Sequence, residues 1–267
     1  MPPEAITQVI RLLVEGVSVR SIERITGKHR DTILNLLVLV GERCQNLLER
    51  TLHDLPVRDV QLDEVWGFVQ CKDKNNHTGN PEFGDAYCFT AIERNTKLVI
   101  TWHLGKKSPH DAWIFVRNLE SATVGNFQAT TDGWAGYPEP MLAYFHDRAS
   151  YSRLIKVYAR TAADEHRYSP PRVVDTIVVD VCGDPDPERI CTSHVERANL
   201  SIRMSMRRLT RLTNGFSKKW ANLHAAYALW FAFYNFCRVH QSLRVTPAME
   251  AGLTDHVWEF GELLEAA

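Results

Sequence analysis

Residues 57–70 decide the fold class of this chain, and they read VRDVQLDEVWGFVQ. The run is rich in β-branched and aromatic residues, and it predicts a strand. Two further strands are predicted at DAYCFTAIE (85–93) and KLVITWHL (97–104), and the polar linkers between the three favour antiparallel pairing. The first strand carries Asp63, whose burial would cost several kcal/mol unless the charge is paired or binds a metal.

After these three predicted strands, strands alternate with helices along the chain. Ser108 and Pro109 signal the start of a helix that reaches residue 119. The next predicted elements are a strand in NFQATTDGW (126–134), a short helix near 138–146 and a strand in RLIKVYA (153–159). Residues 160–191 predict a hairpin-bearing insertion. We therefore expect an α/β (α+β) fold, with a mixed sheet and flanking helices.

The first 43 residues have a helical pattern. An apolar stripe ending at Gly16 predicts one helix, Ser18 can cap a second over 19–25, and a third is predicted over 29–40. This is the helix-turn-helix pattern, whose last helix can lie in the major groove of DNA. The candidate DNA contacts are Lys28, His29, Arg30, Thr32 and Asn35. A plain helical bundle is the alternative.

Charge is distributed unevenly along a chain whose net charge is only −1. Residues 193–245 hold nine Lys/Arg and one acid, Glu196, and such a basic block attracts phosphate backbones. One helix is predicted over 193–212, and a second over 217–237 is so aromatic that we expect it in the core. The candidate DNA contacts of the block are Arg197, Asn199, Arg203, Arg207, Arg208, Arg211, Lys218 and Lys219. A solvated basic face is the alternative.

The composition excludes several classes of protein. With 45% hydrophobic and 24% charged residues, the chain is neither disordered nor collagen-like. Its apolar runs are far shorter than the roughly 18 residues of a bilayer span, and its start does not resemble a secretory signal. The six cysteines form no C-x-x-C pair. We expect a reduced, cytoplasmic setting, with nucleoid association when DNA is bound and no membrane contact.

Three carboxylates stand out by position. Asp63 lies within a strand, Asp132 just past another, and Glu196 on the basic helix. Two of them have simpler interpretations, because Asp132 begins an Asp-Gly turn dipeptide and Ser193 to Glu196 fits an S-x-x-E capping box. Glu64 rivals Asp63, but strand alternation points the two to opposite faces, so only one is expected to face a shared site.

Together, Asp63, Asp132 and Glu196 match the pattern of two-metal phosphoryl-transfer sites. Carboxylate oxygens suit Mg²⁺, and two ions about 3.5–4 Å apart can stabilise the attacking and leaving oxygens of an in-line displacement. We expect these three residues to converge and to bind Mg²⁺ as the cofactor, with Mn²⁺ as a substitute.

The chain resembles the DDE transposases of the insertion-sequence-one family over roughly residues 57–260. The resemblance rests above all on SHVERANLSIRMSMRRLTRLTNGFSKK (193–219). Its other segments are LDEVWGFV (62–69), TTDGWAGY (130–137), LIKVY (154–158), EHRYSP (165–170) and YNFCRVHQSLRVTPAMEAG (234–252). It implies an RNase H-like catalytic domain in which Asp63, Asp132 and Glu196 match the catalytic triad.

The resemblance also implies cut-and-join chemistry on DNA. Such a chain cuts at the terminal inverted repeats of an element, joins the exposed 3′-hydroxyl to target DNA, and acts as a homodimer or higher assembly. A metal-dependent DNA nuclease or resolvase is one alternative, and a transposase-derived DNA-binding regulator without catalysis is another. Family members often carry an N-terminal Cys-rich zinc element that this sequence lacks, so end recognition is expected from residues 4–43 or from a partner chain.

The expected organisation follows from these assignments. The sequence predicts a helix-turn-helix DNA-binding domain (1–45), a linker (46–56), an RNase H-like catalytic domain with the insertion at 160–191 (57–215), and a helical C-terminal extension packed on the catalytic domain (216–267).

Overall fold

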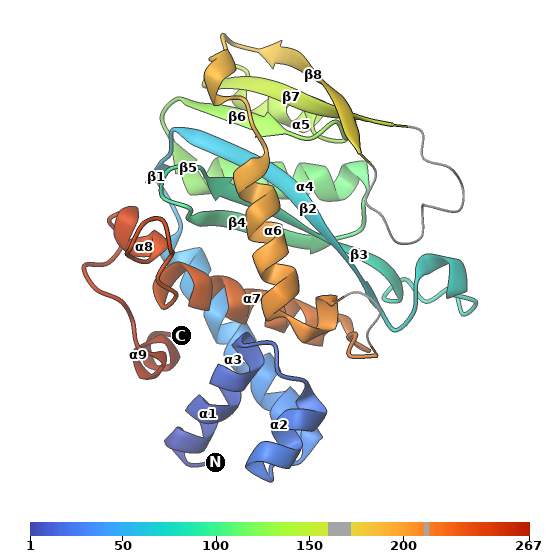
Figure 1. Ribbon diagram of the computed structural model, residues 1–267, viewed down its shortest axis with the longest axis vertical. Helices are drawn as coiled ribbons and strands as arrows, with labels where there is room; N and C mark the ends of the chain where they lie inside the picture. Colours follow the sequence, from blue (N-terminus) through green and yellow to red (C-terminus); the bar gives the residue numbers. More distant parts are fainter. Residues whose placement is uncertain (160–171, 211–213) are drawn as a thin grey trace.

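The structure is a computed structural model that describes residues 1–159, 172–210 and 214–267 (Figure 1). The EHRYSP segment (165–170) and Arg211, an expected DNA contact, lie outside the described residues. Within the described ranges, none of the helices is both long and apolar enough to cross a lipid bilayer.

A six-stranded mixed sheet forms the centre of the fold, which confirms the expected α/β class. Its strand order is β4-β3-β2-β6-β7-β8. The two inner pairings β2–β6 and β6–β7 are parallel, whereas β2–β3, β3–β4 and β7–β8 are antiparallel. The strands are β2 (Asp59–Val69), β3 (Gly84–Glu93), β4 (Val99–Gly105), β6 (Phe127–Thr131), β7 (Ala149–Tyr158) and β8 (Val173–Cys182). Two short strands, β1 (Leu55–Pro56) and β5 (Thr123–Val124), pair in parallel beside this sheet.

The register of β2 and β6 sets the position of the two candidate aspartates. Their last paired residues are Leu62 and Thr131, and β6 ends there while β2 continues. Asp63 and Asp132 are therefore the next residue on each strand, immediately beyond the end of the ladder.

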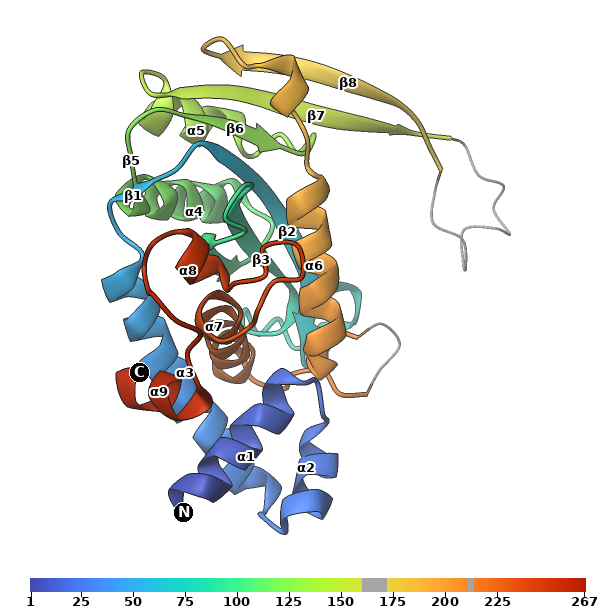
Figure 2. The ribbon, with the colours of Figure 1, turned by 60° about the vertical axis from the view of Figure 1, so that its left-hand side comes forward.

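Helices cover both faces of the sheet. Helix α4 (Pro109–Ala122) lies on one face and α6 (Ser193–Ser205) crosses the other (Figures 1 and 2). The predicted start of α4 is confirmed, since the Ser108 hydroxyl caps it by accepting from the Asp111 N–H. Helix α5 (Pro138–Phe145) follows β6 and contacts α4.

The basic helix is shorter than predicted. Helix α6 ends at Ser205 rather than at residue 212, and a single 3₁₀ turn, η4 (Arg207–Leu209), follows it. The backbone of Met206 is extended, with ψ of 100°, and both Met206 and Leu209 are buried in the core. Burial of these two apolar side chains turns the chain away from the helix axis.

The aromatic helix is core, as predicted. Thirteen of the 17 residues of α7 (Trp220–Phe236) are buried. Asn235 binds the backbone of edge strand β4 in both directions, accepting from the Val99 N–H at 3.0 Å and donating to the Val99 carbonyl at 2.9 Å. The Trp102 ring of β4 packs in tilted contacts against Tyr227 and Phe231, so α7 is fixed to the sheet edge.

The N-terminal helices join this core directly. They are α1 (Pro3–Val14), α2 (Val19–Thr26) and α3 (Arg30–Thr51). The Ser18 cap is confirmed, and Gly27 ends α2 with φ of 66°, a conformation that favours glycine. Helix α3 extends past the predicted end at residue 40 and buries Leu47 and Leu48, so residues 46–51 of the expected linker are helical.

Helix α3 crosses α7 in close contact. A Cβ placed on Gly41 would lie 2.5 Å from the Ala225 backbone, so only glycine fits at this crossing. The last helices are α8 (Pro247–Glu250) and α9 (Phe260–Ala266), and α9 contacts both α1 and α7. The expected insertion contributes β8, which pairs along β7 to form a ribbon that projects beyond the rest of the sheet (Figure 2).

Candidate metal centre beyond the end of strand β6

Three carboxylates meet where the β2–β6 ladder ends. Asp63, Glu64 and Asp132 each place one oxygen within 4.8 Å of the other two. Asp63 and Asp132 were predicted to converge, and they do. Asp63 and Glu64 have different partners, Asn199 of α6 for Asp63 and Lys107 for Glu64, as strand alternation predicts. The expectation that only one of them can face a shared site is wrong, because Asp132 lies beyond the end of β6 and its carboxylate comes near both.

The Asp63 carboxylate is held from two sides. Its Oδ1 accepts from the Glu64 N–H at 2.8 Å, and its Oδ2 accepts from Asn199 Nδ2 of α6 at 2.8 Å. The pKa of Asp63 is raised to about 7, chiefly by burial and also by the charges of Glu64, Asp132 and Glu196, while the hydrogen bond from the Glu64 N–H opposes the rise. A buried group with this pKa gains from a nearby cation, which would favour its charged form.

The Glu64 side chain is only 3% exposed and forms an ion pair with Lys107, with 2.9 Å between Oε2 and Nζ. Burial raises the pKa of Glu64, while Lys107 and Tyr137 oppose that rise. Burial by itself would lower the pKa of Lys107, but the bond to Glu64 and the charge of Asp132 outweigh it, and the net pKa is raised. The ammonium thus stays charged beside the acids.

Asp132 combines the two interpretations considered for it. Its Oδ1 accepts from the Trp134 N–H at 2.9 Å, as in an Asx turn, and it also belongs to the carboxylate cluster. The turn holds the carboxylate at the end of β6, where it can face Asp63.

Glu196 is on the same side of the sheet as Asp63, but it lies outside the 4.8 Å cluster. It is one turn before Asn199 on α6, and its charge contributes to the raised pKa of Asp63. Its carboxylate is engaged elsewhere, in an ion pair with Lys156 of β7 and in a bond from the Thr192 hydroxyl at 2.5 Å. The structure thus brings two of the three predicted acids together and places the third nearby.

The capping box considered as the alternative role of Ser193 and Glu196 is not formed. The helix is preceded by Thr192, and Ser193 is its first helical residue. The free N–H groups of His194 and Val195 donate instead to Gln61 Oε1 of β2, at 3.0 and 3.1 Å. Gln61 and Asp63 share one face of β2, so two side chains of one strand fix the start of α6.

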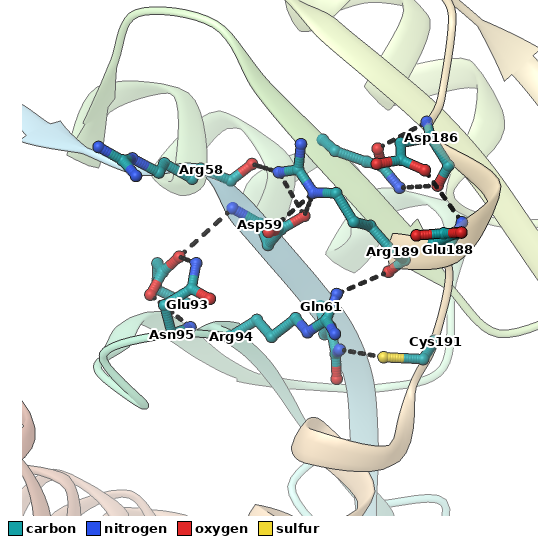
Figure 3. Close-up of polar contacts among 11 residues, drawn as sticks. Arg58, Asp59, Gln61, Glu93, Arg94, Asn95, Asp186, Glu188, Arg189 and Cys191 are labelled. Carbon is teal, nitrogen blue, oxygen red and sulfur yellow. Dashed lines mark hydrogen bonds and ion pairs between the residues drawn. The ribbon is translucent and has the colours of Figure 1, made fainter. Parts of the chain in front are cut away.

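A polar network anchors the segment that leads into α6 (Figure 3). Arg189 pairs with Asp59 at the start of β2, with Nη2 2.7 Å from Oδ1, and its Nη2 donates to the Arg58 carbonyl. The backbone of Asp186 exchanges two hydrogen bonds with the Gln128 amide of β6. Gln61 Nε2 donates to Cys191 Sγ at 3.0 Å. The position of Glu196 is therefore set from both central strands.

Most predicted DNA contacts of the N-terminal region are at the surface. His29, Arg30, Thr32 and Asn35 are exposed at the start of α3, and Lys28 is half-buried. Arg30 also pairs with Glu23, with Nε 3.5 Å from Oε1.

The basic block is divided between the surface and the interior. Arg197, Arg207, Lys218 and Lys219 are exposed, and Arg203 is half-buried. Arg208 turns inward, where Nη1 donates to Ser217 Oγ at 3.0 Å and to the Asn222 carbonyl at 2.9 Å, and burial lowers its pKa to about 10. Asn199 is buried against Asp63. Both side chains hold the fold or the site together in this structure, and their predicted contacts with DNA stay predictions.

Sequence reasoning missed Lys107, Tyr137 and Lys156, which surround the acids. Tyr137 is the last residue of TTDGWAGY, and Lys156 lies in LIKVY. Both segments carry the family resemblance, and this was the one feature of the sequence that could have indicated these two residues. Lys107 follows the third predicted strand with no local pattern to single it out.

The donor set fits a hard divalent ion. Carboxylate oxygens are the ligands that Mg²⁺ prefers, and three converge here. Two further polar atoms are buried without a hydrogen bond to any described residue, Glu64 Oε1 and the Tyr137 hydroxyl. Buried polar atoms of this kind indicate a missing partner.

The comparisons with known proteins give a distant structural likeness and no match in sequence families. No family model and no curated protein matches the sequence. One similar solved structure is described as a cryo-EM structure of the piggyBac transposase synaptic complex with hairpin DNA. The two chains share 11% sequence identity with a TM-score of 0.42, over 97% of this chain and 68% of that one.

Proposed function

We propose that this chain is a DNA transposase of the insertion-sequence-one family, which cuts DNA at element ends and joins the 3′-hydroxyl to target DNA. The observation that carries the proposal is the convergence of the Asp63, Glu64 and Asp132 oxygens within 4.8 Å beyond the end of β6. Acids this close repel one another unless a cation is present. A divalent ion held there would stabilise charge on the attacking and leaving oxygens of a phosphodiester.

The chain's own residues have separate tasks in this proposal. Asp63 and Asp132 would hold Mg²⁺ or Mn²⁺ together with Glu196. Asn199 orients Asp63 and ties α6 to β2, so the helix that carries Glu196 stays beside the aspartates. Glu196 can join them only after its carboxylate leaves Lys156, and the freed ammonium would then face the DNA phosphates.

The exposed polar and basic side chains support DNA as the substrate. The start of α3 would read the element end, within a DNA-binding region of residues 1–45. Arg197, Arg207, Lys218 and Lys219 would contact phosphates beside the catalytic region, residues 57–215. Two element ends must be handled together, so we propose a homodimer or higher assembly on DNA.

A cleavage and joining assay tests the proposal. The full chain is incubated with labelled DNA carrying candidate element ends, intact or precut with a 3′-hydroxyl, in Mg²⁺, in Mn²⁺ and in chelator. We expect cutting and joining in either ion and neither in chelator. Cutting without joining would favour the nuclease or resolvase alternative, and DNA binding without either step would favour the regulator. Glu42→Gln, which removes an exposed charge from α3, is the matched control.

A further inference from the structure

We propose that Glu64 is the third carboxylate that holds a divalent ion in the DNA-free chain, and that Glu196 is withheld from the ion at that stage. The inference rests on the proposed function and divides it into two steps. Asp63, Glu64 and Asp132 first hold the ion, and Glu196 is recruited afterwards. The family resemblance assigns the third place to Glu196, whereas the geometry of this chain gives it to Glu64 first.

Glu64 is built into the site with one oxygen fixed. Lys107 Nζ holds Oε2 at 2.9 Å, and Lys107 is itself confined by the rings of Trp134 and Tyr87, whose centroids lie 5.1 and 5.6 Å from Nζ. The Glu64 side chain is almost fully buried, whereas 32% of the Lys107 side chain is exposed. Its Oε1 makes no hydrogen bond within the described ranges and is left for another partner.

Tyr137 lies beside Glu64 and interacts with it, yet neither the Tyr137 hydroxyl nor Glu64 Oε1 completes a hydrogen bond of ordinary geometry among the described residues. The Tyr137 side chain is fully buried, and its hydroxyl is affected by the charges of Glu64, Asp63 and Asp132. A buried hydroxyl and a buried carboxylate oxygen, both unpaired beside three acids, fit a site that an ion and its water ligands would complete.

Glu196 is held away from this cluster by two partners. Lys156 neutralises its carboxylate, and the Thr192 hydroxyl donates to the same Oε1. The pair is partly open to solvent, with 28% of the Lys156 side chain and 42% of the Glu196 side chain exposed, so it can exchange. Phosphate groups of bound DNA would compete for the Lys156 ammonium and release Glu196.

Calorimetric titration of Mn²⁺ alone into the full DNA-free chain at pH 8 tests the inference. We compare the wild-type chain with Asp63→Asn, Glu64→Gln, Glu196→Gln and the control Glu42→Gln. Loss of even an outer partner weakens metal binding about 10–100-fold, so Glu64→Gln and Asp63→Asn are each expected to weaken Mn²⁺ binding at least about tenfold. Glu196→Gln and Glu42→Gln should bind as the wild type does.

Glu64→Gln also leaves the Lys107 ammonium unpaired, which could weaken the fold. The double variant Glu64→Gln with Lys107→Gln removes that charge. It should recover the melting temperature and still bind Mn²⁺ weakly. Wild-type affinity in a folded Glu64→Gln chain overturns the inference, as does a wild-type chain that binds no Mn²⁺ without DNA. A chain that binds Mn²⁺ through Glu64 but neither cuts nor joins DNA contradicts the proposed function and leaves this inference standing.

Discussion

Asn199 Nδ2 donates to Asp63 Oδ2 at 2.8 Å, and this bond ties helix α6 to the strand that carries the first aspartate. Glu196 precedes Asn199 by one turn, so the same contact fixes how close the third acid can come. Gln61 caps α6 from the same face of β2. Strand and helix are thus joined at two points on either side of Glu196.

Removing the Asn199 amide should destabilise the chain in a pH-dependent way. Asn199→Ala takes away a hydrogen bond to a charged group, worth about 1.5–3 kcal/mol. The loss should be larger at pH 8, where Asp63 is ionised, than at pH 5, where it is protonated. Urea unfolding at the two pH values measures the difference, with Asn126→Ala on an exposed turn as control. An equal loss at both values would mean that the bond does not depend on the Asp63 charge.

Asp63 itself should make the ion-free chain less stable as the pH rises. Its pKa is about 7 in the folded chain, against an ordinary value of 3.8 that applies when it is unfolded. The folded state therefore binds the proton more tightly, and its stability falls as the pH rises from about 4 to about 7. Asp63→Asn removes this pH-dependent loss of stability. The stability of the variant relative to the wild type should therefore increase between about pH 4 and about pH 7 and stay constant at higher pH.

Thermal melts from pH 4.5 to 8.5 without divalent ions measure that gain. In the wild-type chain, Mg²⁺ at pH 8 should recover part of the lost stability, because the ion favours the charged form. A stability difference that stays constant across the pH range would contradict the account of Asp63.

Asp63 and Asp132 could be predicted from sequence because strand patterning placed Asp63 within one strand and Asp132 just past another, and the β2–β6 register brings them level. Glu64 could not, because alternation separates it from Asp63 and gives no indication that Asp132, just past the end of β6, comes near both carboxylates. The internal contacts of Arg208 and Asn199 could not be predicted either. The helical periodicity of 193–212 gives no indication that Met206 and Leu209 end the helix before Arg208, or that the Asn199 face of α6 packs on β2. Ion pairs such as Glu64–Lys107 and Glu196–Lys156 join distant segments, so no local pattern predicts them.

Alanine substitutions of the neighbouring Arg207 and Arg208 should differ in effect, the first on DNA binding and the second on stability. Arg207→Ala removes an exposed charge, so DNA binding should weaken and its salt dependence flatten while the fold keeps its stability. Arg208→Ala removes a buried guanidinium that binds Ser217 and the Asn222 carbonyl, at about 1.5–3 kcal/mol for a hydrogen bond to a charged group. Filter binding over a salt series and urea unfolding separate the two effects. If Arg207→Ala leaves the salt dependence of DNA binding unchanged, this basic face is solvated and does not contact DNA.

The N-terminal helices are best tested by point variants. Deleting residues 1–45 would uncover α7, because α3 packs along it with Leu37, Val40 and Cys44 buried. Arg30→Ala at the start of α3 should instead weaken binding to element-end DNA by about 1–3 kcal/mol if the side chain reads a base. Competition between end DNA and unrelated DNA measures that loss. If the variant and the wild type bind end DNA with equal affinity, these helices have a structural role and Arg30 does not read the DNA.

The central claim is that the carboxylates beyond β6 carry out divalent-ion chemistry on DNA, and Asp132→Asn tests it most directly. An asparagine oxygen can still accept from the Trp134 N–H, so the turn and the melting temperature should be preserved. The charge that would hold the ion is lost. Strand cleavage and joining of end DNA are measured in Mg²⁺ for the wild type and the variant at equal DNA occupancy. We predict that the variant binds DNA and neither cuts nor joins it, and wild-type rates in the variant would contradict the account.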